Sequence, residues 1–419
     1  VRVPVRNARI EMREEDTLFD DSYGEQLTGS DGSFVFSFCD DDGVFDDELE
    51  IYVRLHANLW SNGHDVVEVQ EDGLIPPEDV YEFDSNVIES EGGTYFINFD
   101  LNREQSAVFN IADAILDAWN VWNANGGAVG DDAVFDYQAE VNWESGDDDD
   151  KTFYNGYVWD EITIADSNSN PDEWDDGVII HEWTHQADDN YGCDDNPGGE
   201  HSSRDNNQDV ELAFAEGFAN YYQSAVRSAV GRVDGNFYLD GLGPGGMMGG
   251  YNLETRDVAQ PTLVTTRNEA AVAALLWDLE DSANDGQDRA GFTSRANQET
   301  FTHPTFAENG DVFDDTCTTW VYLTSWRDIG KQADRAVAAI IQQNVGLANF
   351  FGPGLAAAAG NTAAPDLVPA STTAAQAQPG EFKWWQNLTF VVDNSGSMAA
   401  AGKLDAVKTV MKEQVNDLA

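Results

Sequence analysis

Residues 178–185 read Val-Ile-Ile-His-Glu-Trp-Thr-His, and this stretch decides how the chain is interpreted. On a helix, residues i and i+4 share one face. His181 and His185 can therefore direct two imidazoles at one Zn²⁺ ion, at about 2.0–2.1 Å from each nitrogen. Glu182 falls beside them, where its carboxylate can take a proton from an activated water. We therefore expect a helix with a metal-binding face.

The alternative is a pair of surface histidines beside a solvated glutamate. Two observations disfavour it. The chain has only 6 His, so two at this spacing beside a glutamate are informative. The apolar run before His181 also predicts that the start of the helix is buried, and buried polar side chains need partners.

A third ligand is required, because a catalytic zinc site uses three protein ligands and keeps one position for water. The best candidate is Glu216, within residues 211–222 (ELAFAEGFANYY), whose apolar residues recur at helical spacing. Ala213 and Gly217 are small, so we expect this helix to approach the first one closely. A glycine inside a helix costs about 1 kcal/mol relative to alanine and needs such a packing reason. Asn220 is a candidate hydrogen-bond partner for a ligand histidine.

The HEWTH and EGFA segments together resemble the gluzincin metallopeptidases, whose aminopeptidase branch carries a similar NEGFA segment. Thermolysin-like members have an Asp four residues after the second His, which Asp189 matches. They also have an acidic residue four positions after the third ligand, where this chain has Asn220. HEWTH, AFAEGFANYY and residues 274–281 (ALLWDLED) further resemble uncharacterised secreted gluzincin-like domains of prokaryotes. The resemblance covers about residues 106–350 and implies Zn²⁺ held by His181, His185 and Glu216.

The mechanism that the resemblance implies is peptide-bond hydrolysis without a covalent intermediate. Glu182 would act as general base on a zinc-activated water and pass the proton to the leaving amine. A tetrahedral oxyanion also needs a donor besides the metal. Related enzymes use a Tyr or His, and the sequence leaves five candidates unranked: His201, Tyr221, Tyr222, Tyr251 and His303.

The net charge of the chain limits the environments and partners that fit it. The chain carries 78 acidic against 21 basic residues, a net charge of −57, and its first 150 residues contain no Lys. With 41% hydrophobic residues it can still bury cores. Such self-repulsion is screened at molar salt, where the Debye length is about 3 Å. We expect a halophile's protein; a basic partner or calcium loading explains less, because the acid is spread along the chain. Nucleic-acid binding is disfavoured, since phosphate contacts need Lys and Arg.

The number of cysteines and the length of the apolar runs indicate where in or outside the cell the protein is found. Three Cys allow at most one intramolecular disulfide. Cys193 and Cys317 both lie in the peptidase-like region and are the preferred pair, whereas Cys39 is interpreted as a small buried hydrophobe. No apolar run approaches the roughly 20 residues of a membrane span. We expect a secreted or cell-surface protein.

The pattern along the chain predicts a multidomain architecture that begins with β-structure. Residues 1–105 are predicted to be all-β, and Val3–Met12, a TGSDGSFVF hairpin and the LEIYVRL strand resemble a transthyretin-like sandwich. Further strand candidates are Val66–Val69 and Tyr95–Phe99.

Residues 106–352 are expected to form the α+β, zincin-like peptidase domain. It opens with an amphipathic helix from Val108 to Trp122, followed by an alternating strand from Phe135 to Trp143. Phe153–Ala165 is predicted as a second strand, an edge that pairs with extended substrate, with residues 157–159 near the cleft. A Gly-rich loop at 231–250 is a candidate cleft rim. Later helices are expected at Asn268–Asp281 and Arg335–Gln343.

The last segments are a linker and a fragment. Residues 353–384 are rich in Ala, Thr and Pro. Residues 385–419 contain Asp393-Asn-Ser395-Gly-Ser397 after an apolar run and resemble the start of a von Willebrand factor A domain, in which such residues help to hold Mg²⁺ or Ca²⁺. About 35 residues cannot bury a core alone, so we expect a piece of a longer polypeptide.

Residues 277–288 also contain candidate calcium ligands. Oxygen ligands at short spacing suit Ca²⁺, and the candidates are Asp278, Asp281, Asp285 and Asp288. The alternative is solvated acidic surface.

Two functions therefore remain open. The first is a secreted zinc peptidase acting on a peptide or protein substrate. The second is an adhesive or structural surface protein, in contact with a surface protein partner, whose peptidase domain is vestigial or self-processing.

Overall fold

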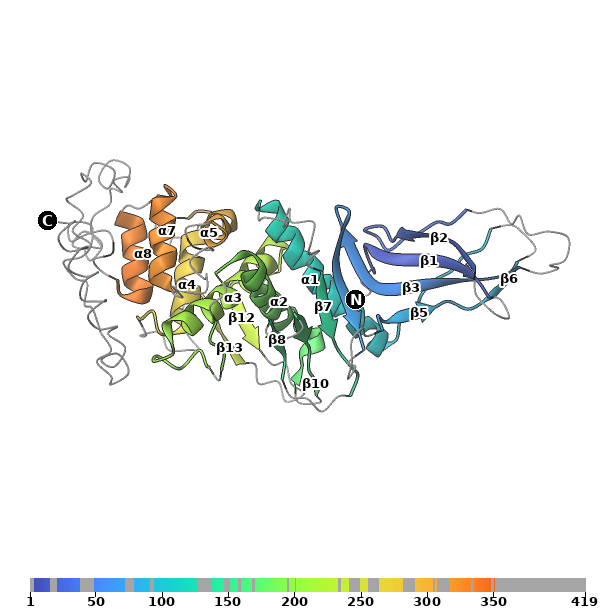
Figure 1. Ribbon diagram of the computed structural model, residues 1–419, viewed down its shortest axis with the longest axis horizontal. Helices are drawn as coiled ribbons and strands as arrows, with labels where there is room; N and C mark the ends of the chain where they lie inside the picture. Colours follow the sequence, from blue (N-terminus) through green and yellow to red (C-terminus); the bar gives the residue numbers. More distant parts are fainter. Residues whose placement is uncertain are drawn as a thin grey trace, which may run out of the picture. The chain divides into compact units, whose positions relative to one another are not determined.

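The nine described strands between Ala8 and Thr163 join into one mixed sheet (Figure 1). The computed structural model describes residues 4–15, 21–37, 49–71, 79–90, 94–126, 138–146, 151–156, 160–167, 170–193, 196–199, 201–232, 235–240, 249–254, 264–281, 291–303, 306, 317–332, 335–347 and 350. The chain divides into two compact units, 1–371 and 372–419, and every described residue belongs to the first. The linker, the A-domain fragment and its candidates Asp393, Ser395 and Ser397 lie outside the described residues.

The sheet has the order β2-β1-β3-β4-β7-β9-β8, with β5 and β6 paired along β3. Its strands are β1 (Ala8–Glu14), β2 (Asp21–Leu27), β3 (Leu49–Ser61), β4 (His64–Gln70), β5 (Glu82–Asp84), β6 (Ile88–Ser90), β7 (Ala139–Asn142), β8 (Phe153–Asn155) and β9 (Glu161–Thr163). The β4–β7 and β7–β9 pairs are parallel, and the other pairs are antiparallel. The described fold is therefore mixed α/β, and its sheet continues across the domain boundary expected near residue 105.

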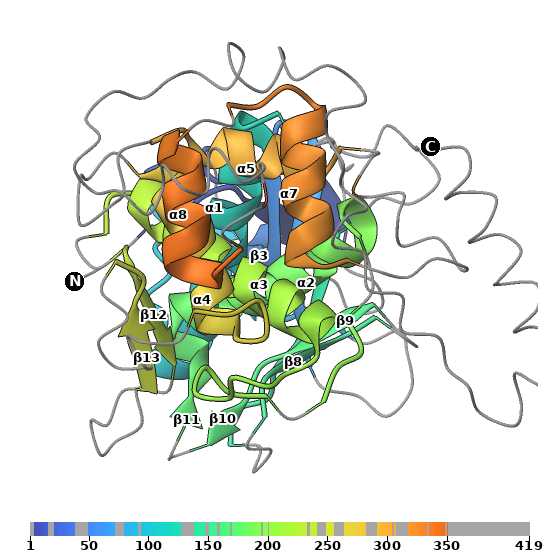
Figure 2. The same ribbon diagram turned by 90° about the vertical axis from the view of Figure 1, so that its left-hand side faces the viewer.

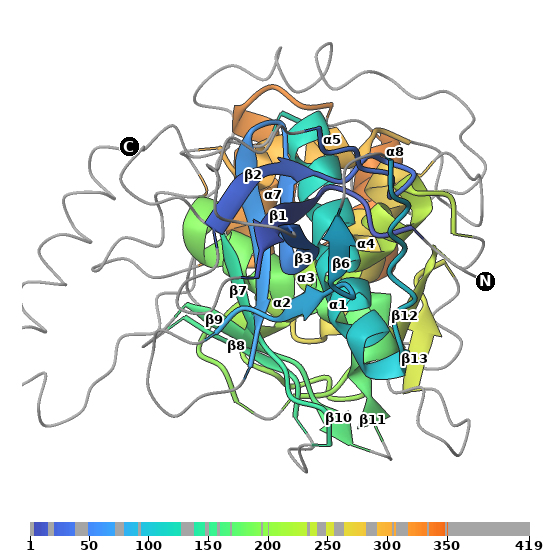
Figure 3. The same cartoon turned by 90° about the vertical axis from the view of Figure 1, so that its right-hand side faces the viewer.

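Helix α1 (Arg103–Ala124) covers this sheet. It packs against β3 and β4, and Figure 3 shows the N-terminal strands in front of it. Residues of three neighbouring strands are fully buried in the sheet, among them Val67, Val141 and Ile162, all with 0% exposure. A capping box between Asn102 and Gln105 fixes where the helix begins.

The helical half contains α2 (Asp176–Tyr191), α3 (Val210–Ala229), α4 (Glu269–Glu280), α5 (Ser294–Phe301), α7 (Thr319–Asp328) and α8 (Arg335–Val345). Figure 2 shows α7 and α8 in front, and α8 packs against α4. Stacked aromatic rings hold this half together, with Phe218 and Phe301 at 3.7 Å between centroids. The short elements are β10 (Asp166–Ser167), β11 (Asn170–Pro171), a 3₁₀ turn at Asp172–Trp174, β12 (Phe237–Asp240) and β13 (Gly249–Asn252). Among the described helices, none has the length and apolar character needed to cross a bilayer.

Several sequence expectations need correction. Phe153–Ala165 is not one strand but the hairpin β8–β9, because the chain turns back before Asp160, which has a positive φ of 56°. Tyr95–Phe99 and the Phe34–Phe36 part of the expected hairpin form no strand. Phe34 and Phe99 instead place their rings 6.4 Å apart, so aromatic residues at alternate positions can pack on each other without a ladder.

Gly217 also has a different neighbour from the one expected. The sequence suggested that it lets α3 approach α2. A Cβ at Gly217 would instead lie 2.6 Å from Cβ of Val272, which belongs to α4. Helix α3 does pack against α2, but the glycine serves the contact with α4.

Candidate metal centre

Helix α2 carries the HEWTH residues. Asp175 caps the helix by accepting hydrogen bonds from the N–H groups of Gly177 and Val178. Val178, Ile179 and Ile180 are buried, as expected. Because α2 packs between α1 and α3, the face that bears His181 and His185 points into the protein rather than to solvent.

Three possible ligand atoms meet between α2 and α3. Nε2 of His181 lies 3.1 Å from Oε2 of Glu216 and 3.1 Å from Nε2 of His185. Nε2 of His185 lies 3.4 Å from the same Glu216 oxygen. Tetrahedral zinc with bonds of about 2.0–2.1 Å keeps its ligand atoms about 3.3 Å apart. Two imidazoles and a carboxylate at these separations fit a metal ion.

Burial makes this group electrostatically unusual. The side chains of His181, His185 and Glu216 are 7%, 11% and 5% exposed. Burial alone raises the pKa of Glu216, but the two histidines outweigh it and hold that pKa well below its ordinary value. Glu216 is therefore a carboxylate. Its other oxygen, Oε1, accepts a hydrogen bond of 3.3 Å from Asn196 Nδ2, a residue that carried no motif in the sequence.

Glu182 lies beside this group on α2. Its Oε2 accepts a 3.0 Å hydrogen bond from the backbone N–H of Tyr154 on β8. Burial raises the pKa of Glu182, while His181, His185 and the Tyr154 N–H act in the opposite direction. Sequence reasoning found Glu182 but not Tyr154, because the contact joins a helix to a strand 28 residues away.

His201 stands out among the five expected oxyanion donors. Its Nε2 is 3.5 Å from Glu216 Oε2, and its Nδ1 is 2.9 Å from Glu269 Oε2. Glu269 is held in turn by the amide of Gln208 at 2.7 Å. Burial lowers the pKa of His201, but Glu269 and Glu216 outweigh it and raise that pKa to about 9. The ring, 33% exposed, is therefore a cationic donor at neutral pH.

Two of the other candidates are used elsewhere. The Tyr221 hydroxyl donates to Glu280 at 2.5 Å, and the Tyr222 hydroxyl donates to the Ala118 carbonyl at 3.3 Å. Tyr251 lies closer to the centre: burial and the charges of Glu269 and Glu216 raise its pKa well above its ordinary value, and its hydroxyl has no hydrogen-bond partner among the described residues. No described contact joins His303 to the His181 group.

The two expected supporting residues make different contacts from those that the sequence suggested. The side-chain oxygen of Asn220 is buried and has no hydrogen-bond partner among the described residues. Nδ1 of His181 is in the same situation, so the bond expected between Asn220 and a ligand histidine is not formed. Asp189 accepts a 2.5 Å hydrogen bond from the Tyr154 hydroxyl and none from either histidine.

The expected disulfide is present at the end of α2. Cys193 and Cys317 are bonded, with Cα atoms 5.6 Å apart and a sequence separation of 124. Cys193 follows the C-cap Gly192 of α2, and Cys317 precedes α7. The bond therefore fixes the start of the loop that carries Asn196 and His201.

A second acidic group lies at the end of α4. Carboxylate oxygens of Glu254, Asp278 and Asp281 lie within 4.8 Å of one another. Trp277 Nε1 donates to Glu254 at 2.9 Å, and Asn344 donates to Asp278 at 2.6 Å. Asp278 and Asp281 were expected as calcium ligands; Glu254 was not, and Asp285 and Asp288 lie outside the described residues. The group is compatible with a metal, and its calcium identity stays a prediction.

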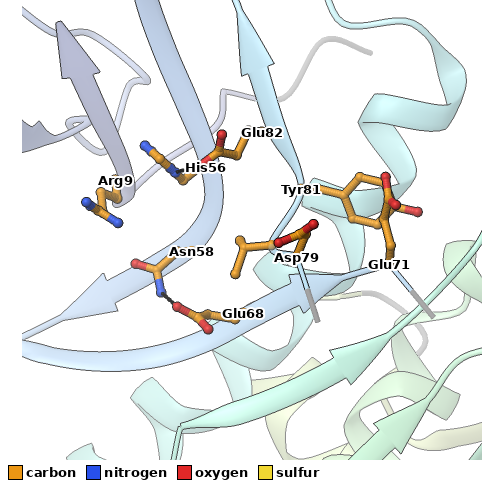
Figure 4. A pocket seen from close by; sticks show the side chains of 9 residues that line it. Arg9, His56, Asn58, Glu68, Glu71, Asp79, Tyr81 and Glu82 are labelled. Carbon is orange, nitrogen blue, oxygen red and sulfur yellow. Dashed lines mark hydrogen bonds and ion pairs between the residues drawn. The ribbon is translucent and has the colours of Figure 1, made fainter. Parts of the chain in front are cut away.

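A pocket of about 580 Å³ opens on the polar side of β3, β4 and β5 (Figure 4). His56 pairs with Glu82 at 3.1 Å, and Asn58 donates to Glu68 at 2.8 Å. The remaining lining residues are Arg9, Glu71, Asp79, Val80 and Tyr81. Two internal pairs therefore account for four of its polar lining residues, and none of the lining residues belongs to the His181 group.

Comparison with known proteins adds little to the geometry. No family model matches the chain. An uncharacterized protein of Archaeoglobus fulgidus is 29% identical over 184 residues, which are 43% of this chain and 45% of that protein. The chain thus matches less than half the length of this relative.

Proposed function

We propose that this chain contains a zinc-dependent peptidase of the gluzincin type, in the region expected to be zincin-like. The observation that carries the proposal is the convergence of Nε2 of His181, Nε2 of His185 and Oε2 of Glu216, with Glu182 on the same helix. Three protein ligands leave a coordination position for water, which is the mark of a catalytic rather than a structural zinc site. When bound there, zinc would activate a water and polarise the scissile carbonyl.

Glu182 is the general base in this proposal. The Tyr154 N–H holds its Oε2, and Oε1 has no hydrogen bond within the described part of the chain, so it is available for a proton. A carboxylate next to two histidines stays ionised more readily than burial alone would allow. After accepting a proton from the attacking water, Glu182 can deliver it to the leaving amine.

His201 is the favoured oxyanion donor of the five candidates. It is the one whose ring nitrogen approaches the Glu216 carboxylate, and Glu269 fixes its orientation from behind. A cationic imidazole held in this way can stabilise a developing negative charge without reorganising.

The edge strand β8 offers a place for the substrate. Among the described strands, β8 pairs with β9 alone. The N–H and the carbonyl of one residue point to the same side of an antiparallel strand. The Tyr154 N–H points away from β9 to Glu182, so the Tyr154 carbonyl also lies on the unpaired edge. An extended peptide can donate a backbone N–H to that carbonyl, as in β-strand addition.

The wider setting belongs to the same proposal. A net charge of −57 supports a halophilic, secreted or cell-surface protein, with the first strands as a transthyretin-like module and residues 385–419 as the start of an A-like domain. In this proposal the A-like segment, which lies outside the described residues, binds Mg²⁺ or Ca²⁺.

The test uses purified full chain in molar KCl. Elemental analysis should give close to one zinc per chain, and a mixed peptide library should be cleaved. Glu182→Gln should keep the zinc and lose cleavage by at least about a hundredfold. Glu211→Gln, the same change on the neighbouring α3, serves as the matched control and should retain both. Zinc without cleavage would instead support a non-catalytic surface protein, and absence of zinc would refute the centre itself.

A further inference from the structure

Tyr154 joins the edge strand to helix α2 at two points. Its backbone N–H donates to Glu182 at 3.0 Å. Its hydroxyl lies 2.5 Å from Oδ2 of Asp189 on α2 and 2.8 Å from Oδ1 of Asp160, which precedes β9. One residue therefore contacts the proposed general base with its backbone and a pair of carboxyl groups with its side chain.

The surroundings fit tightly around this hydroxyl. A Cβ at Gly156 would lie 2.7 Å from Asp189 Oδ2 and 3.0 Å from the Tyr154 hydroxyl, so only a glycine fits there without a shift. Gln186 Nε2 reaches Oδ1 of Asp160 at 3.3 Å. Polar atoms of Tyr154, Asp160 and Gln186 thus fasten the β8–β9 hairpin to α2.

The hydroxyl of Tyr154 lies at hydrogen-bond distance from two carboxyl oxygens. Burial raises the pKa of Tyr154, and both carboxylates add to that effect, so the phenol keeps its proton. Burial also raises the pKa of Asp160, as does the charge of Asp189; Tyr154 and Gln186 act in the opposite direction. The neutral phenol is therefore the donor at this junction.

We propose that Tyr154 is a positioning residue: its hydroxyl, held between Asp160 and Asp189, locks the β8–β9 hairpin to α2 and keeps the Tyr154 N–H on Glu182. The consequence for catalysis rests on the proposed peptidase function, whereas the clamp itself does not.

Hydrogen exchange at the Tyr154 amide measures the clamp directly. The experiment follows that amide in the zinc-loaded full chain in molar KCl at one fixed pH, with rates divided by the intrinsic rate. Protection should be high in the wild type. Tyr154→Phe should lower it about tenfold or more, because the N–H loses its hydrogen bond to a charged group.

Two further variants separate the clamp from general packing. Asp189→Asn keeps a side-chain oxygen that can accept from the Tyr154 hydroxyl, so protection should persist. Tyr23→Phe is the matched control, because Tyr23 donates to Glu14 at 2.6 Å in the N-terminal sheet, and it should match the wild type. Protection that is unchanged in Tyr154→Phe overturns the proposal.

Measurements of kcat and KM then test the proposed peptidase function independently of the clamp. If the chain is a peptidase, Tyr154→Phe should lower kcat more than it changes KM, because Glu182 loses its fixed orientation. A chain in which Glu182→Gln changes no cleavage fails as a peptidase, and the exchange result still decides the clamp.

Discussion

Substituting Gly217 by alanine tests how closely α3 and α4 are packed beside the metal centre. The added Cβ would lie 2.6 Å from Cβ and 2.7 Å from Cγ1 of Val272, and 2.9 Å from the carbonyl oxygen of Glu269. Ordinary contacts between such atoms begin near 3.4 Å, so the two helices must separate by somewhat under 1 Å.

The expected magnitude combines two opposing effects. Overpacking a well-packed core typically costs about 1–3 kcal/mol. Alanine is favoured over glycine inside a helix by about 1 kcal/mol. The net expectation is a loss of about 1–2 kcal/mol in the free energy of unfolding. The Glu269 backbone must move as well, so the Glu269–His201 pair should loosen.

Urea unfolding at fixed molar KCl, followed by circular dichroism, measures the first effect as a shift of the midpoint. Zinc titration of the same variant measures whether the loosened Glu269–His201 pair weakens metal binding. Ser228→Ala, on the exposed last turn of α3, is the control and should leave the midpoint close to that of the wild type. A Gly217→Ala protein as stable as the wild type would show that α3 and α4 can repack freely, and the argument for the glycine would be refuted.

Three further predictions follow from buried or paired groups. Burial raises the pKa of Glu173 to about 7, above its ordinary value of 4.5, so ionising it costs stability as pH rises. Glu173→Gln should therefore add up to about 3 kcal/mol at pH 8 and little at pH 5, and an equal gain at both pH values would contradict this. Replacing Cys193 and Cys317 by serine should cost about 2–5 kcal/mol in thermal or urea unfolding; an unchanged midpoint would argue against a structural role for the bond. His201→Gln should lower kcat by roughly a hundredfold while His303→Gln leaves it unchanged, and equal effects of the two would remove His201 from the site.

Local patterns in the sequence predicted much of the helical part. The two helices that carry His181 and Glu216 follow from apolar residues at helical spacing, and caps such as Asp175 mark where they begin. The strand predictions were less successful, because alternating apolar and polar residues indicate that one face of a strand is buried. They do not indicate which other strand it pairs with. The break within Phe153–Ala165 depends on a turn that brings β8 back along β9, which no local pattern specifies.

Around the candidate centre, too, local spacing predicted some contacts and tertiary packing decided the others. His181 and His185 are neighbours on one helix, so their spacing alone placed them together. Glu216 was inferred from its segment, and the structure brings its Oε2 to 3.1 Å from His181. Asn196 and Glu269 come from a loop and from the start of α4, and they had no motif.

By itself, the sequence determined the chemistry that this chain can offer: a histidine pair and a glutamate on one helix, a second acidic helix, a disulfide pair and a strongly acidic surface. These features depend on residue identity and on spacings of a few positions, which the helix geometry converts directly into proximity. Only the tertiary structure decided which groups complete the centre. The N–H of Tyr154, the pairing of His201 with Glu269 and the contact of Gly217 with Val272 all arise where distant segments pack, and no short-range rule links those segments before the chain has folded.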